Sequence, residues 1–234
     1  MLDLVAFDAD DTLWRSEHMF QDAQARFRAL LAEHADPEGL GPRMLAAERR
    51  NLARYGFGVK AFTLSLVETA LEVTENRVPG AVLAEVLEMG REMLAAPVDL
   101  LPGAAETLRT LHGHVPLAIV TKGDLLDQER KVAASGLAPL VEAVEIVSAK
   151  TPETYARLFE RLGTAPARAM MVGNSMRSDV RPPVEIGAWG VHVPSEVEWE
   201  LERAPDPPGD RFVRLRRIDA LPHLVGAIMS QTLK

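Results

Sequence analysis

The feature that most restricts the fold is the alternation of short apolar runs with helix-like stretches in the second half of the chain. After Leu101-Pro102-Gly103, helical spacing predicts helices that end near His112, begin after Asp124 and span 152–162. Between them, apolar runs predict strands at 116–120, 144–147, 169–172 and 190–193. Strands that alternate with helices pair in parallel, because each crossover needs a covering helix. We therefore predict an α/β fold with a parallel sheet covered by helices.

One more strand is predicted at the start of the chain. The apolar run 2–7 stops abruptly at Asp8-Ala9-Asp10-Asp11-Thr12, as a buried strand does when it enters a polar loop. Ligands of parallel sheets bind beyond the carboxyl ends of the strands. We expect that edge to bring Asp8, Thr121 and Gly173 together.

Residues 16–96 have a different pattern, which interrupts the sheet after its first strand. Apolar residues such as Phe20, Ala23 and Phe27 recur at helical spacing, and roughly four helices fit into this stretch. Tyr55-Gly56-Phe57-Gly58 is typical of a loop between two of them. We predict an all-helical insert in the α/β core.

Composition excludes several classes of protein. With 47% apolar and 26% charged residues, the 234-residue chain can bury the core of a globular protein. A formal net charge of -8 argues against a nucleic-acid partner, and the absence of cysteine excludes disulfides and thiolate metal sites. Residues 1–7 lack the features of a signal peptide, and no apolar run approaches the ~20 residues that cross a bilayer. We expect a soluble cytoplasmic protein that does not associate with membranes.

Three carboxylates lie within four positions at the end of the first predicted strand. Asp8, Asp10 and Asp11 would repel one another without a cation or a shared proton. Their oxygen ligands suit Mg²⁺, whereas zinc would need cysteines or clustered histidines. Aspartates also form turns and cap helices, and for Asp11 we favour that role. Asp8 and Asp10 have the alternate spacing that lets both point toward one substrate.

Four segments resemble the motifs of the haloacid dehalogenase (HAD) superfamily, in the same order along the chain. Asp8-Ala9-Asp10-Asp11-Thr12 is similar to the first motif, Asp-x-Asp-x-Thr, and Thr121 at the end of an apolar run is similar to the second. Lys150-Thr151-Pro152 resembles the third motif, and the segment 171–179 resembles the fourth. The resemblance implies a Rossmann-like core of residues 1–15 and 98–234, with residues 16–97 forming a helical C1 cap.

The resemblance also implies roles for individual residues. Asp8 is expected to attack phosphorus and form an aspartyl phosphate, while Asp10 protonates the leaving alcohol and then deprotonates the attacking water. Thr121 and the backbone amides near Lys122 and Gly123 are expected to bind the phosphate, and Lys150 to offset its charge. The expected Mg²⁺ ligands are the Asp8 carboxylate, the main-chain carbonyl of Asp10, and the side chains of Asn174 and Asp179.

Two positions depart from the HAD pattern. The fourth motif usually contains Gly-Asp, whereas this chain has Gly173-Asn174, which offers a neutral amide oxygen and predicts weaker metal binding. Lys150 is followed by Thr151-Pro152, one residue longer than the usual Lys-Pro pair.

The resulting hypothesis is a phosphatase that acts on a small phosphorylated metabolite, as a monomer or a homodimer. A 2-haloacid dehalogenase is the enzymatic alternative, and Asp10 argues against it because a halide needs no proton donor. A catalytically weak binding protein is the other alternative, and only Asn174 supports it. Within the insert, Lys60 beside the Tyr55–Gly58 loop is a candidate for contact with an anionic substrate, although an ordinary helix connection explains this loop equally well.

Overall fold

The computed structural model describes residues 2–231. The predicted core of residues 1–15 and 98–234 therefore has its first residue and its last three residues outside the described part. These residues form two compact units. One unit contains the chain up to Glu17, then Val98–Lys122, and the described chain from Glu129 onward. The other contains His18–Pro97 and Gly123–Gln128. Gly123–Gln128 therefore groups with the helices of the insert, whereas the sequence places it in the core.

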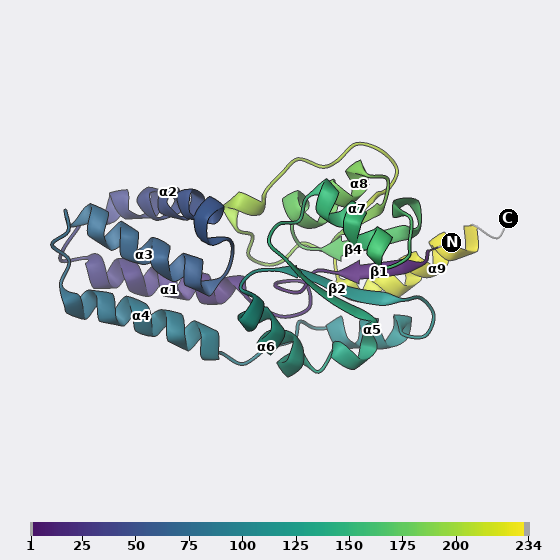
Figure 1. Ribbon diagram of the computed structural model, residues 1–234, viewed down its shortest axis with the longest axis horizontal. Helices are drawn as coiled ribbons and strands as arrows, with labels where there is room; N and C mark the ends of the chain where they lie inside the picture. The colour runs from purple at the N-terminus through teal and green to yellow at the C-terminus, as the bar shows by residue number, and fades with distance from the viewer. Residues whose placement is uncertain (1, 232–234) are drawn as a thin grey trace. The chain divides into compact units, whose positions relative to one another are not determined.

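The first unit is built on a six-stranded sheet in which all neighbouring strands are parallel (Figure 1). The strand order is β3-β2-β1-β4-β5-β6, which places β1 in the middle. The strands are β1 (Leu4–Phe7), β2 (Leu117–Lys122), β3 (Ala143–Val147), β4 (Ala169–Gly173), β5 (Trp189–His192) and β6 (Phe212–Arg214). The predicted fold class is confirmed, and β6 is a strand that the sequence analysis did not identify.

Helices cover both faces of the sheet. Successive side chains of each strand point to opposite faces, so each strand contacts helices on both sides. Val5 and Phe7 lie in one apolar cluster with residues of α5, α6 and α9, and Leu4 and Ala6 lie in another with residues of α7. The helices are α5 (Ala104–Leu111), α6 (Leu125–Ser135), α7 (Pro152–Arg161), α8 (Arg181–Glu185) and α9 (Leu221–Gln231). Burial on both sides explains why the central strands consist almost entirely of apolar residues.

The insert contains the four helices that its apolar spacing predicts. They are α1 (Glu17–Leu31), α2 (Pro37–Tyr55), α3 (Val59–Val73) and α4 (Gly80–Ala95). Their apolar faces form a separate core that includes Phe27, Leu66 and Met89. Gly56, Phe57 and Gly58 lie between α2 and α3 as expected, whereas Tyr55 is the last residue of α2.

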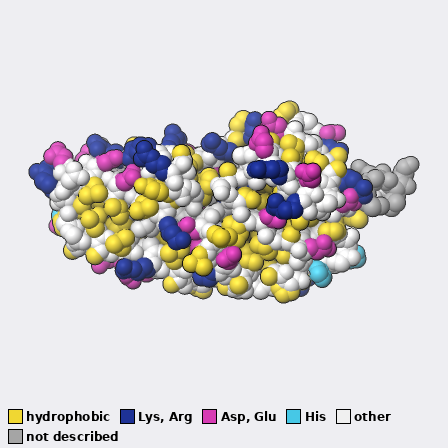
Figure 2. Space-filling view, in the orientation of Figure 1, with side chains coloured by type: hydrophobic (Ala, Val, Ile, Leu, Met, Phe, Trp, Pro, Cys, Tyr) yellow, Lys and Arg dark blue, Asp and Glu magenta, His cyan; other side chains and the backbone are white. Residues whose placement is uncertain are grey.

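The described surface mixes acidic and basic side chains. In the view of Figure 2, the Lys and Arg side chains are scattered among Asp and Glu side chains, and apolar side chains gather over part of the helical unit. Exposed large apolar residues of that unit include Tyr55, Leu64 and Leu87. Within residues 2–231, no helix combines the length and the apolar character needed to cross a membrane.

Candidate active site

The candidate site lies at the carboxyl ends of β1, β2 and β4, which are neighbours in the sheet. Asp8 follows β1, and its backbone N–H donates to the Val172 carbonyl of β4 at 2.8 Å. Thr121 is the last residue but one of β2. Lys150 lies in the connection after β3, and Asp179 lies in the turn after β4. Four segments that are distant in the sequence therefore meet at one edge of the sheet, where parallel sheets bind their ligands.

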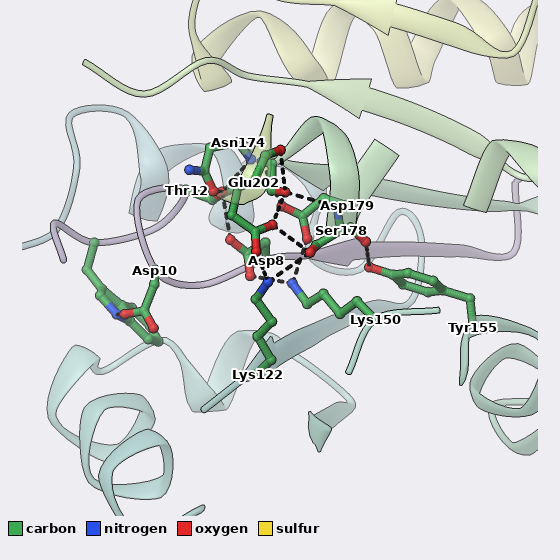
Figure 3. A network of polar contacts seen from close by, with 12 residues as sticks. Asp8, Asp10, Thr12, Lys122, Lys150, Tyr155, Asn174, Ser178, Asp179 and Glu202 are labelled. Atoms are coloured by element: carbon green, nitrogen blue, oxygen red, sulfur yellow. Dashed lines mark hydrogen bonds and ion pairs between the residues drawn. The ribbon is translucent and has the colours of Figure 1, made fainter. Parts of the chain in front are cut away.

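Lys150 joins two buried carboxylates at the centre of the site. Its ammonium group pairs with Asp8 Oδ1 and, at 2.6 Å, with Asp179 Oδ1 (Figure 3). The side chains of Lys150 and Asp179 are each 1% exposed, and that of Asp8 is 9% exposed. One cation therefore faces two anions in a region from which water is largely excluded, which leaves an excess of negative charge.

This excess shifts the protonation of both partners. Burial raises the pKa of Asp8 from 3.8 to about 7, and the nearby charge of Asp179 adds to the rise, while Lys150 opposes it. Burial alone would lower the pKa of the Lys150 ammonium, but the two carboxylates outweigh burial and raise it. Lys150 is therefore a permanent cation, whereas Asp8 needs a further positive charge to be fully ionised at neutral pH.

Asp179 is held by a single turn of π-helix, Met176–Val180. Its Oδ2 accepts a hydrogen bond from the Ser175 backbone N–H at 2.9 Å, and the buried Tyr155 hydroxyl donates to the Ser178 carbonyl at 3.0 Å. A Cβ atom at position 173 would overlap the Asp179 carboxylate, so only glycine fits there. π-Helical turns are rare and occur frequently at functional sites. The local backbone thus directs Asp179 toward Lys150.

Thr12, the last residue of the first motif, connects Asp8 with the fourth motif. Its hydroxyl lies 3.2 Å from Asp8 Oδ2 and accepts a hydrogen bond from the Asn174 backbone N–H at 3.0 Å. One atom of the Asn174 side-chain amide lies 3.1 Å from Asp8 Oδ2 and 3.2 Å from the Asp10 carbonyl oxygen. The side chain of Asn174 and the main chain of Asp10 therefore meet at the Asp8 carboxylate.

The donor atoms at this point fit a hard divalent cation. They are a carboxylate oxygen of Asp8, the Asp10 carbonyl oxygen and, when the amide oxygen faces Asp8, the side-chain oxygen of Asn174. The Asp179 carboxylate is joined to Asp8 through Lys150. Mg²⁺ is bound by oxygen atoms of these kinds, usually with several waters. Among the described residues, no three His, Asp or Glu side chains are grouped as metal ligands, so a metal here depends on the amide and carbonyl oxygens.

The Asp10 carboxylate does not join this cluster. It accepts a hydrogen bond from the Trp14 indole N–H at 2.8 Å and pairs with the buried Lys131 ammonium at 3.0 Å. Figure 3 shows it apart from the residues around Asp8. Asp11 accepts hydrogen bonds from the backbone N–H groups of Ser16 and Glu17 at the start of α1, which confirms the predicted capping role.

Thr121 has an unsatisfied group at the site. Its hydroxyl oxygen is buried and makes no hydrogen bond within residues 2–231. Leaving a buried polar group without a partner costs roughly 1–3 kcal/mol, so such groups call for an explanation. A substrate oxygen at the end of β2 would supply the missing partner.

The side chain of Lys122 is engaged by a residue that sequence analysis did not identify. Its ammonium pairs with Glu202 and lies 2.8 Å from Ser178 Oγ. The Glu202 carboxylate also accepts hydrogen bonds from Ser175 and, at 2.6 Å, from Ser178. Burial works to raise the pKa of Glu202, but Lys122 and the two hydroxyls lower it below its ordinary value. No motif marks Glu202, which belongs to a short 3-10 helix between β5 and β6.

Two further residues from the sequence analysis belong to the helical unit. Lys60, near the start of α3, pairs with Asp124 at 3.4 Å, and its backbone N–H donates to the same carboxylate. Gly123 has a φ of 144°, a conformation that favours glycine. Their contact with a substrate stays a prediction.

Comparison with known proteins identifies the family. A family model described as haloacid dehalogenase-like hydrolase matches residues 2–187. No curated protein matches the chain. A haloacid dehalogenase-like family hydrolase from Xanthomonas campestris is 38% identical, with a TM-score of 0.88 over 98% of this chain and 93% of that one.

Two more distant structures share the fold. A predicted phosphoglycolate phosphatase from Haemophilus somnus is 16% identical, with a TM-score of 0.63 over 96% of this chain and 98% of its own. An L-2-haloacid dehalogenase from Xanthobacter autotrophicus, with chloropropionic acid covalently bound, is 22% identical, with a TM-score of 0.64 over 97% of this chain and all of its own. The same architecture thus occurs in proteins described as phosphatase and as dehalogenase.

Proposed function

This chain belongs to the haloacid dehalogenase-like hydrolases, and we propose that it is a magnesium-dependent phosphatase of small phosphate monoesters. The observation that carries the proposal is the buried Asp8–Lys150–Asp179 cluster, together with the unsatisfied Thr121 hydroxyl at the carboxyl end of the neighbouring strand β2. A nucleophilic carboxylate, a fixed cation and an available hydrogen-bond donor are the groups that phosphoryl transfer requires.

The first chemical step joins the Asp8 carboxylate to phosphorus. An oxygen of Asp8 attacks, the bond between phosphorus and the ester oxygen breaks, and the departing alcohol takes a proton from the Asp10 carboxyl group. Thr121 donates its hydroxyl to a phosphate oxygen, and Lys150 offsets the charge that Asp8 and the phosphate share. A bound Mg²⁺, held by Asp8, the Asp10 carbonyl, Asn174 and Asp179, would neutralise the remaining charge.

The second step releases phosphate. Asp10, now a carboxylate, takes a proton from water as the water oxygen attacks phosphorus, and the bond from phosphorus to Asp8 breaks. For both steps Asp10 has to leave Trp14 and Lys131 and turn toward Asp8, because it is tied to those two side chains in the structure. We assign the helical unit the role of a cap that excludes water, with Lys60 as a contact for an anionic substrate.

Asp10 is what favours phosphate esters over haloacids. Loss of an alcohol from phosphorus needs a proton donor, whereas loss of a halide does not. A dehalogenase would therefore gain nothing from a carboxyl group held two residues beyond its nucleophile.

Hydrolysis of p-nitrophenyl phosphate with and without Mg²⁺ tests this function. We expect turnover that depends on Mg²⁺, falls at least about 10³-fold in Asp8→Asn and falls about 10²-fold or more in Asp10→Asn. Asp3→Asn is the matched control, because Asp3 precedes β1, at the opposite end of that strand from Asp8, and pairs with Arg168. Halide release from 2-chloropropionate in the same preparations, without phosphatase activity, would show that the reaction is dehalogenation.

A further inference from the structure

The side-chain amide of Asn174 lies between two sets of polar groups. On one side, an amide atom faces Asp8 Oδ2 at 3.1 Å and the Asp10 carbonyl oxygen at 3.2 Å. On the other side, the second amide atom lies 3.3 Å from the Ser195 hydroxyl, which donates to the Val197 carbonyl at 2.5 Å. Rotation by half a turn about the Cβ–Cγ bond exchanges the amide nitrogen and oxygen between these positions.

With its nitrogen toward Asp8, the amide satisfies the site without a metal. The NH₂ group then donates to the Asp8 carboxylate and to the Asp10 carbonyl, which are both acceptors. Its oxygen faces Ser195, whose hydroxyl can donate to it only by giving up the bond to Val197. In this orientation the Asn174 amide links Asp8 and Asp10 by hydrogen bonds, and the cost to Ser195 is small.

With its oxygen toward Asp8, the amide is suited to a cation. Three oxygen atoms, from Asn174, Asp8 and Asp10, then face one another, and the single Thr12 hydroxyl can donate to only one of them. The amide nitrogen meanwhile donates to Ser195, which keeps its bond to Val197. A divalent ion supplies the positive charge that these oxygens lack.

We propose that Asn174 is a reversible metal ligand, which donates to Asp8 and Asp10 when no Mg²⁺ is bound and turns to present its oxygen when Mg²⁺ binds. Ser195 acts as the positioning residue that holds the turned amide. This inference rests on the proposed function in that Mg²⁺ is the ion that the site takes.

An amide at position 174 therefore favours the stability of the metal-free protein and lowers its affinity for Mg²⁺. A carboxylate at position 174 would add a third negative charge beside Asp8 and Asp179, and Lys150 already serves both of them. The amide avoids that repulsion when the site is empty. The cost is that Mg²⁺ must displace the hydrogen bonds of the amide before it can bind.

Mg²⁺ titration in the absence of substrate tests this proposal, with calorimetry for the affinity and thermal unfolding for the stability. We expect Asn174→Asp to lower the melting temperature of the metal-free protein and to bind Mg²⁺ about tenfold more tightly. We expect Ser195→Ala to leave the metal-free melting temperature within about 2 °C of the unsubstituted protein and to bind Mg²⁺ about tenfold more weakly. Ser230→Ala is the control, because the exposed Ser230 hydroxyl donates to the Gly226 carbonyl within its own helix, α9.

The side-chain amide resonances of Asn174 provide a direct readout. They are identified by their absence from the nitrogen-15 spectrum of Asn174→Asp, and we expect Mg²⁺ to shift them as the amide exchanges partners. Unchanged resonances at saturating Mg²⁺, or a Ser195→Ala variant that binds Mg²⁺ as tightly as the Ser230→Ala control, would overturn the proposal. The expected titrations in a protein that fails to hydrolyse phosphate esters would support it while rejecting the proposed function.

Discussion

The motif segments and the connection between β5 and β6, residues 193–211, both supply side chains to the same site, but they do so in different ways. The motifs place Asp8, Lys150 and Asp179 around the position of the chemistry. The connection lies beyond residue 187, where the family match ends, yet it buries Glu202 against Lys122. The motifs therefore define the reacting groups, whereas a segment without a motif supplies the carboxylate of Glu202, which offsets the charge of Lys122 next to them.

The largest effect is expected from removing the cation between the two buried carboxylates. Lys150→Met leaves Asp8 and Asp179 facing each other without compensation, and breaking a buried ion pair costs about 3–5 kcal/mol. Urea unfolding of the metal-free protein measures this loss. Lys60→Met, which removes a half-exposed lysine, is the control and should change stability by no more than about 0.5 kcal/mol. Equal losses in the two variants would show that Lys150 contributes no more to the free energy of unfolding than an exposed lysine does.

A second test concerns the nucleophile itself. Because the pKa of Asp8 is raised from 3.8 to about 7, the folded protein binds an extra proton between these values, and its stability falls as the pH rises through this window. Asp8→Asn cannot ionise, so the metal-free variant should be more stable than the unsubstituted protein, by roughly 4 kcal/mol at pH 8. The gain should shrink toward zero near pH 4. A variant that is less stable at pH 8 contradicts this reading of the site.

The smallest effect is expected in the connection between β5 and β6. Glu202→Gln leaves Lys122 with a neutral partner, and we expect a loss of about 1–3 kcal/mol at pH 7 in urea unfolding. The pKa of Glu202 is lowered, so its contribution is fully present above the ordinary value of 4.5 and is lost as the pH falls below it. The difference between the two proteins should therefore narrow in acid.

Glu196→Gln is the control for Glu202→Gln, since Glu196 is an exposed residue of the same connection and pairs only loosely with Arg15, at 3.5 Å. We expect it to change stability by less than about 0.5 kcal/mol. A loss as large as that of Glu202→Gln would mean that the whole connection, and not its buried carboxylate, carries the effect.

Sequence reasoning predicted the sheet because its central strands are buried on both faces and read as continuous apolar runs. It missed β6 because Phe212–Arg214 is short and only partly buried, so its composition resembles that of a loop. The strand ends correctly indicated that Asp8, Thr121 and Gly173 share an edge. Geometry of this kind follows from sheet topology alone.

Other features of the site depend on partners that are far away in the sequence. Glu202 meets Lys122, 80 residues earlier, and no local pattern marks either the carboxylate or its turn. The tie between Asp10 and Lys131 likewise joins residues 121 positions apart. Contacts of this kind are set by tertiary packing, which neither the periodicity nor the motifs of a single sequence encode.

The central place of β1 has a consequence for the synthesis of the protein. β1 is made before β2 and β4, yet it pairs with both of them, and β4 ends at Gly173. The insert helices α1–α4 lie within residues 17–95 and can pack while the later strands are still being made. Asp8 therefore gains its neighbours only after most of the chain has been made. A nascent chain halted before β4 would leave the edge of β1 that faces β4 unpaired, and an exposed apolar strand edge is prone to aggregation.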